Sequence, residues 1–193
     1  FLIITINKLL CHFASKMKGE EFRLDVRVTG SYMLRFAFTK LMMYLRGLLR
    51  LRKLVLIGRN TQLLARSQLN VGCSVSIDDD CVVNALSREG IVLGDHVSVQ
   101  KRTIIECTGS LRHLGKGLVL GRNVGIGSNS FLGCAGGIEI GDDTIIGNYV
   151  SFHAENHNYS DPSQPIRAQG VSHQGIKVGR GCWIGAKATI LDG

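Results

Sequence analysis

The stretch LGRNVG-IGSNSF-LGCAGG, residues 120–137, repeats a six-residue pattern that decides the fold. Each hexad opens on an aliphatic residue, often followed by Gly, and carries a small residue four places later. The pattern returns as IGDDTI-IGNYVS-FHAENH over residues 140–157 and as VGRGCW-IGAKAT-ILDG over residues 178–193. Corresponding positions in the first two triplets lie twenty residues apart, which is three hexads plus a two-residue step. Such a period is the mark of a repeat architecture.

A hexapeptide period predicts a parallel β-helix, an all-β solenoid in which three short strands make one coil. The helical alternative fails because a period of six does not keep one helix face apolar and because Gly is too frequent. Small residues fill the corners, and Gly, Asn and Asp accept the backbone angles of the turns. Weaker turns with short excursions at Ala85–Gly90 and Thr108–Gly117 extend the repeat back to Leu56. The predicted inward positions are Val71, Ile77, Leu93, Val99, Ile105, Leu120, Ile126, Leu132, Ile140, Ile146, Phe152, Val178, Ile184 and Ile190, with Thr144, Val150, Cys182 and Ala188 at corners.

One segment breaks the repeat: FHAENHNYSDPSQPIRAQGVSHQG, residues 152–175. The same hexads flank it on both sides, so residues 153–175 form an arm inserted into one coil of the domain 56–193. The arm holds His153, His157 and His173, three of the six histidines of the chain. Because the chain stops in the middle of a coil, we expect the natural protein to continue with further coils.

Residues 1–55 form a basic, largely helical N-terminal segment. Up to Lys53 there are eleven Lys and Arg against three acidic residues, and the rest of the chain has twelve of each. Because the +8 net charge lies in this quarter alone, the broad basic footprint of a nucleic-acid-binding protein is not indicated. We predict a short helix near Leu2–Phe13, a loop around Gly19–Gly30, and a clearer amphipathic helix over Ser31–Leu54.

Two roles for the Ser31–Leu54 helix stay open. Its apolar face, with Leu34, Ala37, Leu41, Tyr44, Leu45 and Leu48, can cap the end of the solenoid, which would otherwise expose core and unpaired strand edges. Alternatively, residues 31–54 make peripheral contact with an anionic membrane, with Arg35, Arg46, Arg50 and Lys53 toward the headgroups. No apolar run is long enough to span a bilayer. The six cysteines lack zinc-ligand spacing and suit reduced, buried thiols.

The segments GGIEIGDDTIIGNYVSFHAENHNYSDPSQPIRAQGV and IKVGRGCWIGAKATILDG resemble the hexapeptide-repeat acyltransferases. Within that superfamily they look like the maltose and galactoside O-acetyltransferase branch, and most of all like acetyltransferases of bacterial capsule, colanic-acid and O-antigen gene sets. The resemblance is tight over residues 121–193, moderate over 56–122 and general before that. It implies a left-handed parallel β-helix and a homotrimer with active sites between neighbouring subunits.

The resemblance also implies the site. His157 matches the catalytic histidine, Trp183 matches the Trp of the WIGA motif, and Gly185 and Ala186 match the backbone that approaches the pantetheine of acetyl-CoA. The acceptor-orienting asparagine corresponds to Asn129, unless Gly127 occupies its place. On the arm we also assign substrate contacts to Asn156, Tyr159 and Arg167, although Asn156 equally suits a turn and Arg167 equally suits bracing the arm.

Histidine suits the chemistry because its pKa lies near working pH, so it can take the proton of a sugar hydroxyl that attacks a thioester. The chain has no nucleophile motif such as GxSxG, so we predict direct transfer without a covalent enzyme intermediate. Backbone N–H groups at the coil turns are candidate oxyanion donors, and Glu155 or Asp161 is either a partner that orients the imidazole or a solvated carboxylate. No metal is required.

The sequence therefore predicts an acetyl-CoA-dependent O-acetyltransferase of bacterial surface or exopolysaccharide biosynthesis, acting on a free or lipid-linked carbohydrate. We expect it in the cytoplasm, either free or peripheral at the inner face of the cytoplasmic membrane. Three alternatives remain: an N-acyltransferase of an amino sugar, a zinc-dependent carbonic-anhydrase-like hexapeptide protein, and a non-catalytic scaffold. The histidine spacing of the zinc family is not reproduced by His153 and His157.

Overall fold

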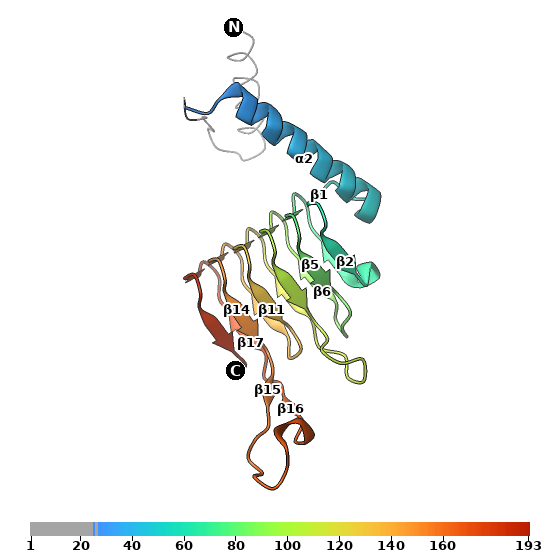
Figure 1. The fold of residues 1–193 in the computed structure, drawn as a ribbon, viewed down its shortest axis with the longest axis vertical. Coiled ribbons are helices and arrows are strands. Elements are labelled where there is room, and N and C mark those ends of the chain that lie inside the picture. Colours follow the sequence, from blue (N-terminus) through green and yellow to red (C-terminus); the bar gives the residue numbers. More distant parts are fainter. Residues whose placement is uncertain (1–24, 26) are drawn as a thin grey trace. The chain divides into compact units, whose positions relative to one another are not determined.

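The structure is a computed structural model that describes Asp25 and residues 27–193. It shows helix α2 (Gly30–Leu51) followed by many short strands (Figure 1). The chain divides into two compact units, residues 1–42 and 43–193, so the last turns of α2 belong with the strands, whereas the predicted boundary fell at 55/56. The predicted helix at Leu2–Phe13 and most of the predicted loop at Gly19–Gly30 lie outside the described residues.

In the described part of the chain the strands after α2, apart from the two antiparallel strands of the arm, form three sheets of parallel strands. Each of these sheets takes every third strand of the coils. Sheet A contains β1 (Leu56–Ile57), β4 (Ser76–Ile77), β7 (Ser98–Val99), β10 (Gly125–Ile126), β13 (Ile145–Ile146) and β18 (Trp183–Ile184). Sheet B contains β2 (Gln62–Leu64), β5 (Val82–Asn84), β8 (Ile104–Glu106), β11 (Phe131–Gly133), β14 (Ser151–His153) and β19 (Thr189–Leu191). Sheet C contains β3 (Leu69–Val71), β6 (Ile91–Leu93), β9 (Leu118–Leu120), β12 (Ile138–Ile140) and β17 (Ile176–Val178). The short helix η1 (Arg66–Gln68) precedes β3.

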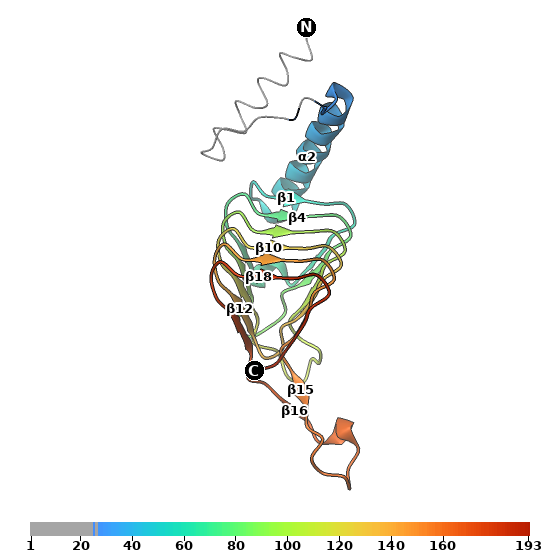
Figure 2. The same ribbon diagram turned by 90° about the vertical axis from the view of Figure 1, so that its left-hand side faces the viewer.

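The three sheets together make a parallel β-helix, in which each turn of the chain contributes one strand to each sheet. Figure 2 shows the coils stacked on one another. The pairing register confirms the twenty-residue spacing of the repeat: Leu120 pairs with Ile140, and Leu132 pairs with Phe152. The predicted inward residues are buried from Val71 to Phe152, while Val178, Ile184 and Ile190 in the last coil are partly buried against the same core. The left-handed sense of coiling stays a prediction.

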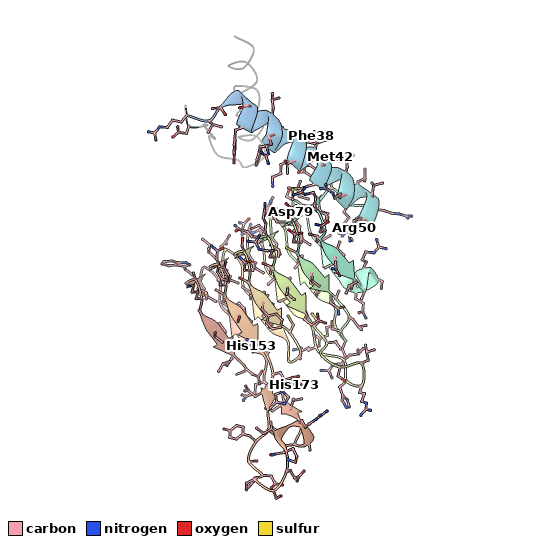
Figure 3. All side chains as sticks on the ribbon, viewed as in Figure 1. Phe38, Met42, Arg50, Asp79, His153 and His173 are labelled. Atoms are coloured by element: carbon pink, nitrogen blue, oxygen red, sulfur yellow. The ribbon has the colours of Figure 1, made fainter. Side chains whose placement is uncertain are left out.

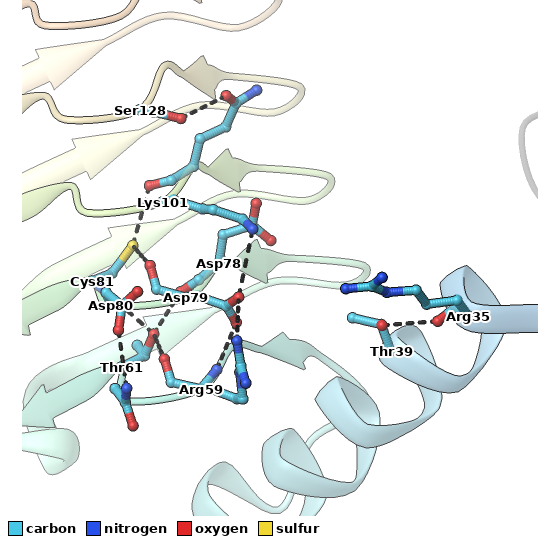
Figure 4. Close-up of polar contacts among 12 residues, drawn as sticks. Arg35, Thr39, Arg59, Thr61, Asp78, Asp79, Asp80, Cys81, Lys101 and Ser128 are labelled. Carbon is cyan, nitrogen blue, oxygen red and sulfur yellow. Dashed lines mark hydrogen bonds and ion pairs between the residues drawn. The ribbon is translucent and has the colours of Figure 1, made fainter. Parts of the chain in front are cut away.

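The corners between sheets are held by side chains that bond to the turn of the previous coil. At one of them Asp79 accepts a hydrogen bond from the Arg59 N–H at 2.8 Å and lies 3.6 Å from the Lys101 ammonium (Figure 4). Burial acts to raise the pKa of Asp79, but the Arg59 N–H and the two neighbouring cations outweigh it and lower that pKa. Asp80 and Asn60 take positive φ values of 59° and 53° at the same corner, as expected for turn-forming Asp and Asn.

Helix α2 ends at Leu51, three residues earlier than predicted, because Arg52 adopts a left-handed backbone with φ 54°. This is the usual geometry of a residue just past a helix C-terminus. The helix then meets the first coil through a close backbone approach: a Cβ added at the buried Gly47 would lie 2.0 Å from the Val55 carbonyl oxygen. The residues that follow the turn start sheet A directly.

Basic side chains bond to the open end of the first coil, in addition to Leu51, which packs against the core. Arg46 donates to the Ile57 carbonyl at 3.4 Å, Arg50 to the Thr61 carbonyl at 2.6 Å, and Lys53 to the Val71 carbonyl at 2.7 Å. In the second coil the corresponding carbonyls of Ile77, Cys81 and Leu93 each accept an N–H from the first coil. The first coil has no preceding coil, so these three cations satisfy the acceptors that a missing coil would otherwise satisfy.

A cap made by the predicted apolar face of the helix stays a prediction, and several residues of that face do not supply the contact. Leu45 and Leu48 remain exposed, whereas Met43 is buried and Leu51 packs, partly buried, against the core beside the basic side chains. Arg46, Arg50 and Lys53, which the membrane alternative turned toward headgroups, are instead engaged with backbone carbonyls. Within the described residues, no helix combines the length and the apolarity that a membrane crossing requires.

Candidate active site

The arm leaves the β-helix at the corner between sheets B and C. It begins after β14, runs through β15 (Asn156–His157), η2 (Ile166–Ala168) and β16 (Val171–Ser172), and returns to β17. Strands β15 and β16 pair antiparallel, with His157 opposite Val171, so the arm is a hairpin that projects beyond the coils (Figure 1). The His157 side chain is exposed on this hairpin.

The tip of the arm is organised by Gln169. Its amide nitrogen donates to the carbonyls of Asp161 at 2.8 Å and Gln164 at 3.0 Å, and its amide oxygen accepts from the Asp161 N–H at 3.1 Å. Asn158 donates to the Gln169 carbonyl at 3.0 Å and so ties the start of the arm to its end. These bonds give a long polar segment a defined shape although it buries little apolar surface.

Neither carboxylate considered as a partner of His157 orients that imidazole within the chain. Asp161 accepts hydrogen bonds from the Ser163 N–H and hydroxyl and from Gln164, which lower its pKa and make it a turn-forming residue. Glu155 lies 3.8 Å from the His173 imidazole instead (Figure 3 labels His153 and His173). His153 lies on β14 with its ring 5.4 Å from that of Phe131.

The root of the arm is fixed by residues that the sequence did not single out. Asp192, after the last strand, accepts the N–H groups of Gln174 and Gly175 at 2.8 and 2.7 Å. Ala154, where the arm begins, is buried. Its N–H donates a hydrogen bond to the Gly133 carbonyl and its carbonyl accepts one from the Gly136 N–H, both in the preceding coil. The sequence does place an Asp just after a predicted strand at position 192. Only the register of the coils, however, shows that this Asp lies next to the end of the arm.

The remaining predicted site residues lie elsewhere on the same chain. Asn129, Gly185 and Ala186 occupy turns between sheets A and B, where Asn129 has φ 58° and accepts a hydrogen bond from Arg102 at 2.7 Å. Trp183 lies on sheet A with 81% of its side chain exposed. One whole sheet, B, separates these turns from the corner that carries the arm. Within one chain, therefore, the structure does not bring the residues predicted to bind acetyl-CoA close to His157.

On the arm itself, Asn156 pairs with Ser172 in the hairpin, Tyr159 is 79% exposed, and Arg167 lies in η2 with its side chain exposed. A shallow groove of about 430 Å³ crosses sheet C between Val119, Glu139 and Lys177, and none of the predicted site residues lines it. Among residues 25 and 27–193, no three His, Cys, Asp or Glu side chains gather as metal ligands.

The chemical capacity of this arrangement follows from its geometry. An imidazole on a projecting, internally bonded hairpin is accessible to a substrate proton, but it has no opposing wall on its own chain. Base catalysis requires the reacting oxygen within hydrogen-bond reach and a second surface that holds the other reactant. The fold and the arm therefore define a β-helix protein whose candidate base lies exposed on an inserted hairpin.

No protein-family model matches the chain. A protein of Mycobacterium tuberculosis (strain ATCC 25618 / H37Rv) named as a probable acetyltransferase is 32% identical over 56 residues, which is 29% of this chain and 19% of that relative. The chain thus spans about a fifth of the length of this curated relative.

Among solved structures, a variant of AntD, an N-acyltransferase from Bacillus cereus in complex with dTDP and coenzyme A, aligns with a TM-score of 0.50. The alignment has 20% sequence identity and covers 70% of this chain and 65% of AntD. A second AntD variant with the same ligands aligns with a TM-score of 0.43. The likeness to the first of these variants supports the fold. Both comparisons find acyltransferases as the proteins to which this chain is similar.

Proposed function

We propose that the chain is an acyltransferase that uses acetyl-CoA and a sugar acceptor, with His157 as general base. The observation that carries the proposal is the position of His157: it lies exposed on a long hairpin inserted between two strands of the β-helix. The similarity to a mycobacterial acetyltransferase and to the fold of AntD supports the reaction class.

In the proposed reaction a sugar hydroxyl oxygen attacks the thioester carbonyl carbon while His157 takes the hydroxyl proton. The tetrahedral oxyanion is stabilised by backbone N–H donors at a coil turn. The carbon–sulfur bond then breaks, the leaving thiolate receives the proton from His157, and the products are the acetylated sugar and CoA with a free thiol. The imidazole starts and finishes neutral, so no other group has to supply or remove a proton.

The residues that bind the acyl donor, acetyl-CoA, would come from a neighbouring subunit. Trp183, Gly185, Ala186 and Asn129 lie on or beside sheet A, away from the corner that holds the arm. In a homotrimer the arm of one subunit reaches that surface of the next, which supplies the wall that His157 lacks on its own chain. We place the reaction in the cytoplasm and in the biosynthesis of bacterial surface or extracellular polysaccharide.

The acceptor atom is either oxygen or nitrogen. We favour a hydroxyl because the arm motifs NHNYSDP and PIRAQG resemble the O-acetyltransferase branch, whereas AntD, named as an N-acyltransferase, favours an amino sugar. Parallel assays with a sugar panel and with matched amino sugars separate the two, since only one panel should accept radiolabelled acetyl groups at a substantial rate.

His157→Ala tests the assignment of the base. Loss of a general base lowers the rate by roughly 10²–10⁴-fold, and binding of CoA should not change. His153→Ala is the matched control, since His153 is an exposed histidine outside the hairpin. Near-full activity of the His157 variant would refute the assignment, and stoichiometric zinc in elemental analysis would favour the carbonic-anhydrase-like alternative.

The exposed leucines of α2 suggest a second role, attachment to a membrane surface. Leu34, Leu41, Leu45 and Leu48 recur at steps of three, four and seven along the helix and are exposed, as an interfacial helix requires. Flotation with anionic vesicles tests this role. If Leu45→Ser/Leu48→Ser floats as well as the unchanged protein, the helix is not the attachment site.

A further inference from the structure

One face of sheet B, next to the root of the arm, carries an aromatic side chain between polar ones. The last residues of β5, β8, β11 and β14 are Asn84, Glu106, Gly133 and His153, and the strand register aligns them in consecutive coils. All four positions point outward, because the residue before each of them is buried in the core. The arm begins directly after β14, so this row of residues ends at the root of the arm.

Phe131 supplies the aromatic surface of the row. A Cβ added at Gly133 would lie 2.9 Å from Cε1 and 3.4 Å from Cζ of Phe131, so the ring extends along its own strand and lies over Gly133. The His153 ring borders it, with the two centroids 5.4 Å apart and the planes tilted by 38°. Ile104, in register with Phe131 in the preceding coil, is 41% exposed and extends the apolar surface. Phe131 is only half-buried, so its surroundings do not close over it.

Polar groups lie beside the ring on the side of the preceding coil. Neighbouring strands are about 4.8 Å apart, so Glu106 is one strand away from the position of Gly133 that the ring covers. The Asn84 amide donates to Oε1 of Glu106 at 2.8 Å, and its amide oxygen accepts from the Leu86 N–H at 3.2 Å. These bonds fix the carboxylate and leave Oε2 of Glu106 without a partner among the described residues.

The chemistry of this face matches one class of ligand. A pyranose ring has C–H bonds on its faces and hydroxyls around its rim. The C–H bonds carry slight positive charge and pack on the negative face of an aromatic ring, whereas the hydroxyls need hydrogen-bond partners at the edge of that ring. Phe131 offers the aromatic face, and Glu106 offers the acceptor beside it. A phosphate or another anion is not favoured, because the charged group next to the ring is a carboxylate.

The same face is close to the candidate base. His157 follows His153 by four residues, so their Cα atoms lie at most about 14 Å apart. The Phe131 ring extends along its strand in the direction of the corner from which the arm leaves. A carbohydrate that lies on this ring therefore extends toward the arm of the same chain.

We propose that Phe131 and Glu106 form a subsite for a pyranose ring of the acceptor, with Phe131 under the ring and Oε2 of Glu106 accepting a hydrogen bond from a hydroxyl. The inference rests on the proposed function, because it takes the bound sugar to be the acceptor that His157 activates. It assigns the acceptor to the chain that carries the arm, whereas acetyl-CoA is assigned to the neighbouring subunit. His153 borders the edge of the aromatic ring and is given no contact with the sugar.

Sugar binding to the whole chain without acetyl-CoA tests the subsite directly. The probes are methyl β-glucoside, methyl β-galactoside and methyl α-mannoside, and binding is followed by saturation-transfer NMR. We expect Phe131→Leu to weaken binding about tenfold and Phe131→Tyr to keep it, because Leu still covers Gly133 but has no aromatic face. Phe38→Leu is the matched control, since Phe38 is an exposed phenylalanine on α2. Equal binding by the Phe131→Leu and Phe38→Leu proteins, or no binding of any probe, would overturn the proposal.

A second variant keeps the proposal testable if Phe131→Leu does not fold, which circular dichroism shows. Glu106→Gln retains one oxygen for the bond from Asn84 and removes the charged acceptor, so sugar binding should weaken about tenfold. Glu139→Gln is its control, since Glu139 lies on the outward face of sheet C and pairs with Lys177 at 3.6 Å. If the variants change the mass measured by sedimentation and leave sugar binding unchanged, this face is a contact between copies of the chain and the subsite is wrong.

Transfer assays separate this inference from the proposed function. With both correct, Phe131→Leu raises the KM for the sugar about tenfold and leaves kcat and the KM for acetyl-CoA unchanged. If the unchanged protein acetylates a sugar and neither the Phe131 nor the Glu106 variant changes the KM for it, the subsite is wrong and the acyltransferase stands. If sugar binding depends on Phe131 but no acetyl group is transferred, the acyltransferase is wrong and the subsite stands.

Discussion

Replacement of Arg50 by Met tests whether polar side chains cap the open end of the β-helix. Met keeps much of the stem length and removes only the guanidinium that donates to the Thr61 carbonyl at 2.6 Å. Thr61 is buried, so water reaches its carbonyl poorly once the donor is gone. The hydrogen bond from Arg66 to the Arg50 carbonyl does not involve the side chain that is changed.

The magnitude follows from the loss of one charge-assisted bond. Hydrogen bonds to charged groups contribute about 1.5–3 kcal/mol, and an unsatisfied buried acceptor costs about 1–3 kcal/mol. Arg50 is only half-buried, so water replaces part of the interaction and we expect the lower end, about 1–2 kcal/mol. In a chain of this size that corresponds to a melting-temperature drop of roughly 2–8 °C.

The assay is thermal and urea unfolding followed by far-ultraviolet circular dichroism. Trp183 fluorescence is unsuited because that side chain is largely exposed in the folded chain. Arg35→Met is the control, since it removes the same charge from an exposed position of the same helix. The reasoning is refuted if Arg50→Met and Arg35→Met change the unfolding midpoint equally. Lys53→Met should behave like Arg50→Met, because it frees the Val71 carbonyl at the sheet C edge.

Two further predictions concern the helix joint and the arm. Gly47→Ala should lower the unfolding midpoint, because the new Cβ would lie 2.0 Å from the Val55 carbonyl oxygen. This loss should outweigh the helix propensity of Ala, which exceeds that of Gly by about 1 kcal/mol. A higher midpoint in circular dichroism would contradict the close approach. Asp192→Ala should speed amide exchange at Gln174 and Gly175 and reduce acetyl transfer, because it removes both hydrogen-bond acceptors at the root of the arm. Asp192→Asn should keep part of the protection from exchange, because its amide oxygen still accepts. Unchanged exchange in the Ala variant would show that Asp192 does not position the arm.

Much of the fold was predictable because its cause is local. A coil of a β-helix places the same residue type at the same position every turn, so the aliphatic positions and the register of Leu120 against Ile140 could be read from spacing. The arm was predictable for the same reason, as a segment that breaks a regular period must leave the coil. The residues that shape its tip, such as Gln169, were not, since their bonds link positions with no periodic relation.

The α2 helix shows what the apolar pattern does not reveal. Its leucine face predicted an apolar cap, but the first coil presents unpaired carbonyls, and hydrogen-bond demand is satisfied by Arg46, Arg50 and Lys53. A buried acceptor without a partner costs more than a few exposed leucines, so the cations face the coil and Leu45 and Leu48 do not. Which carbonyls lack a partner depends on where the stack begins, and that is a property of the folded coils.

The sequence by itself determined that this protein is built from hexad coils, that one arm interrupts them, and that His157 is on that arm. Only the tertiary structure decided that the arm and the turns with Asn129, Gly185 and Ala186 stand on opposite sides of sheet B. It also decided that Lys116 and His173 border one pair of glycines although they are far apart in the chain. Periodicity fixes each residue's place within a coil, but neighbours across coils depend on the lengths of the excursions, which follow no period.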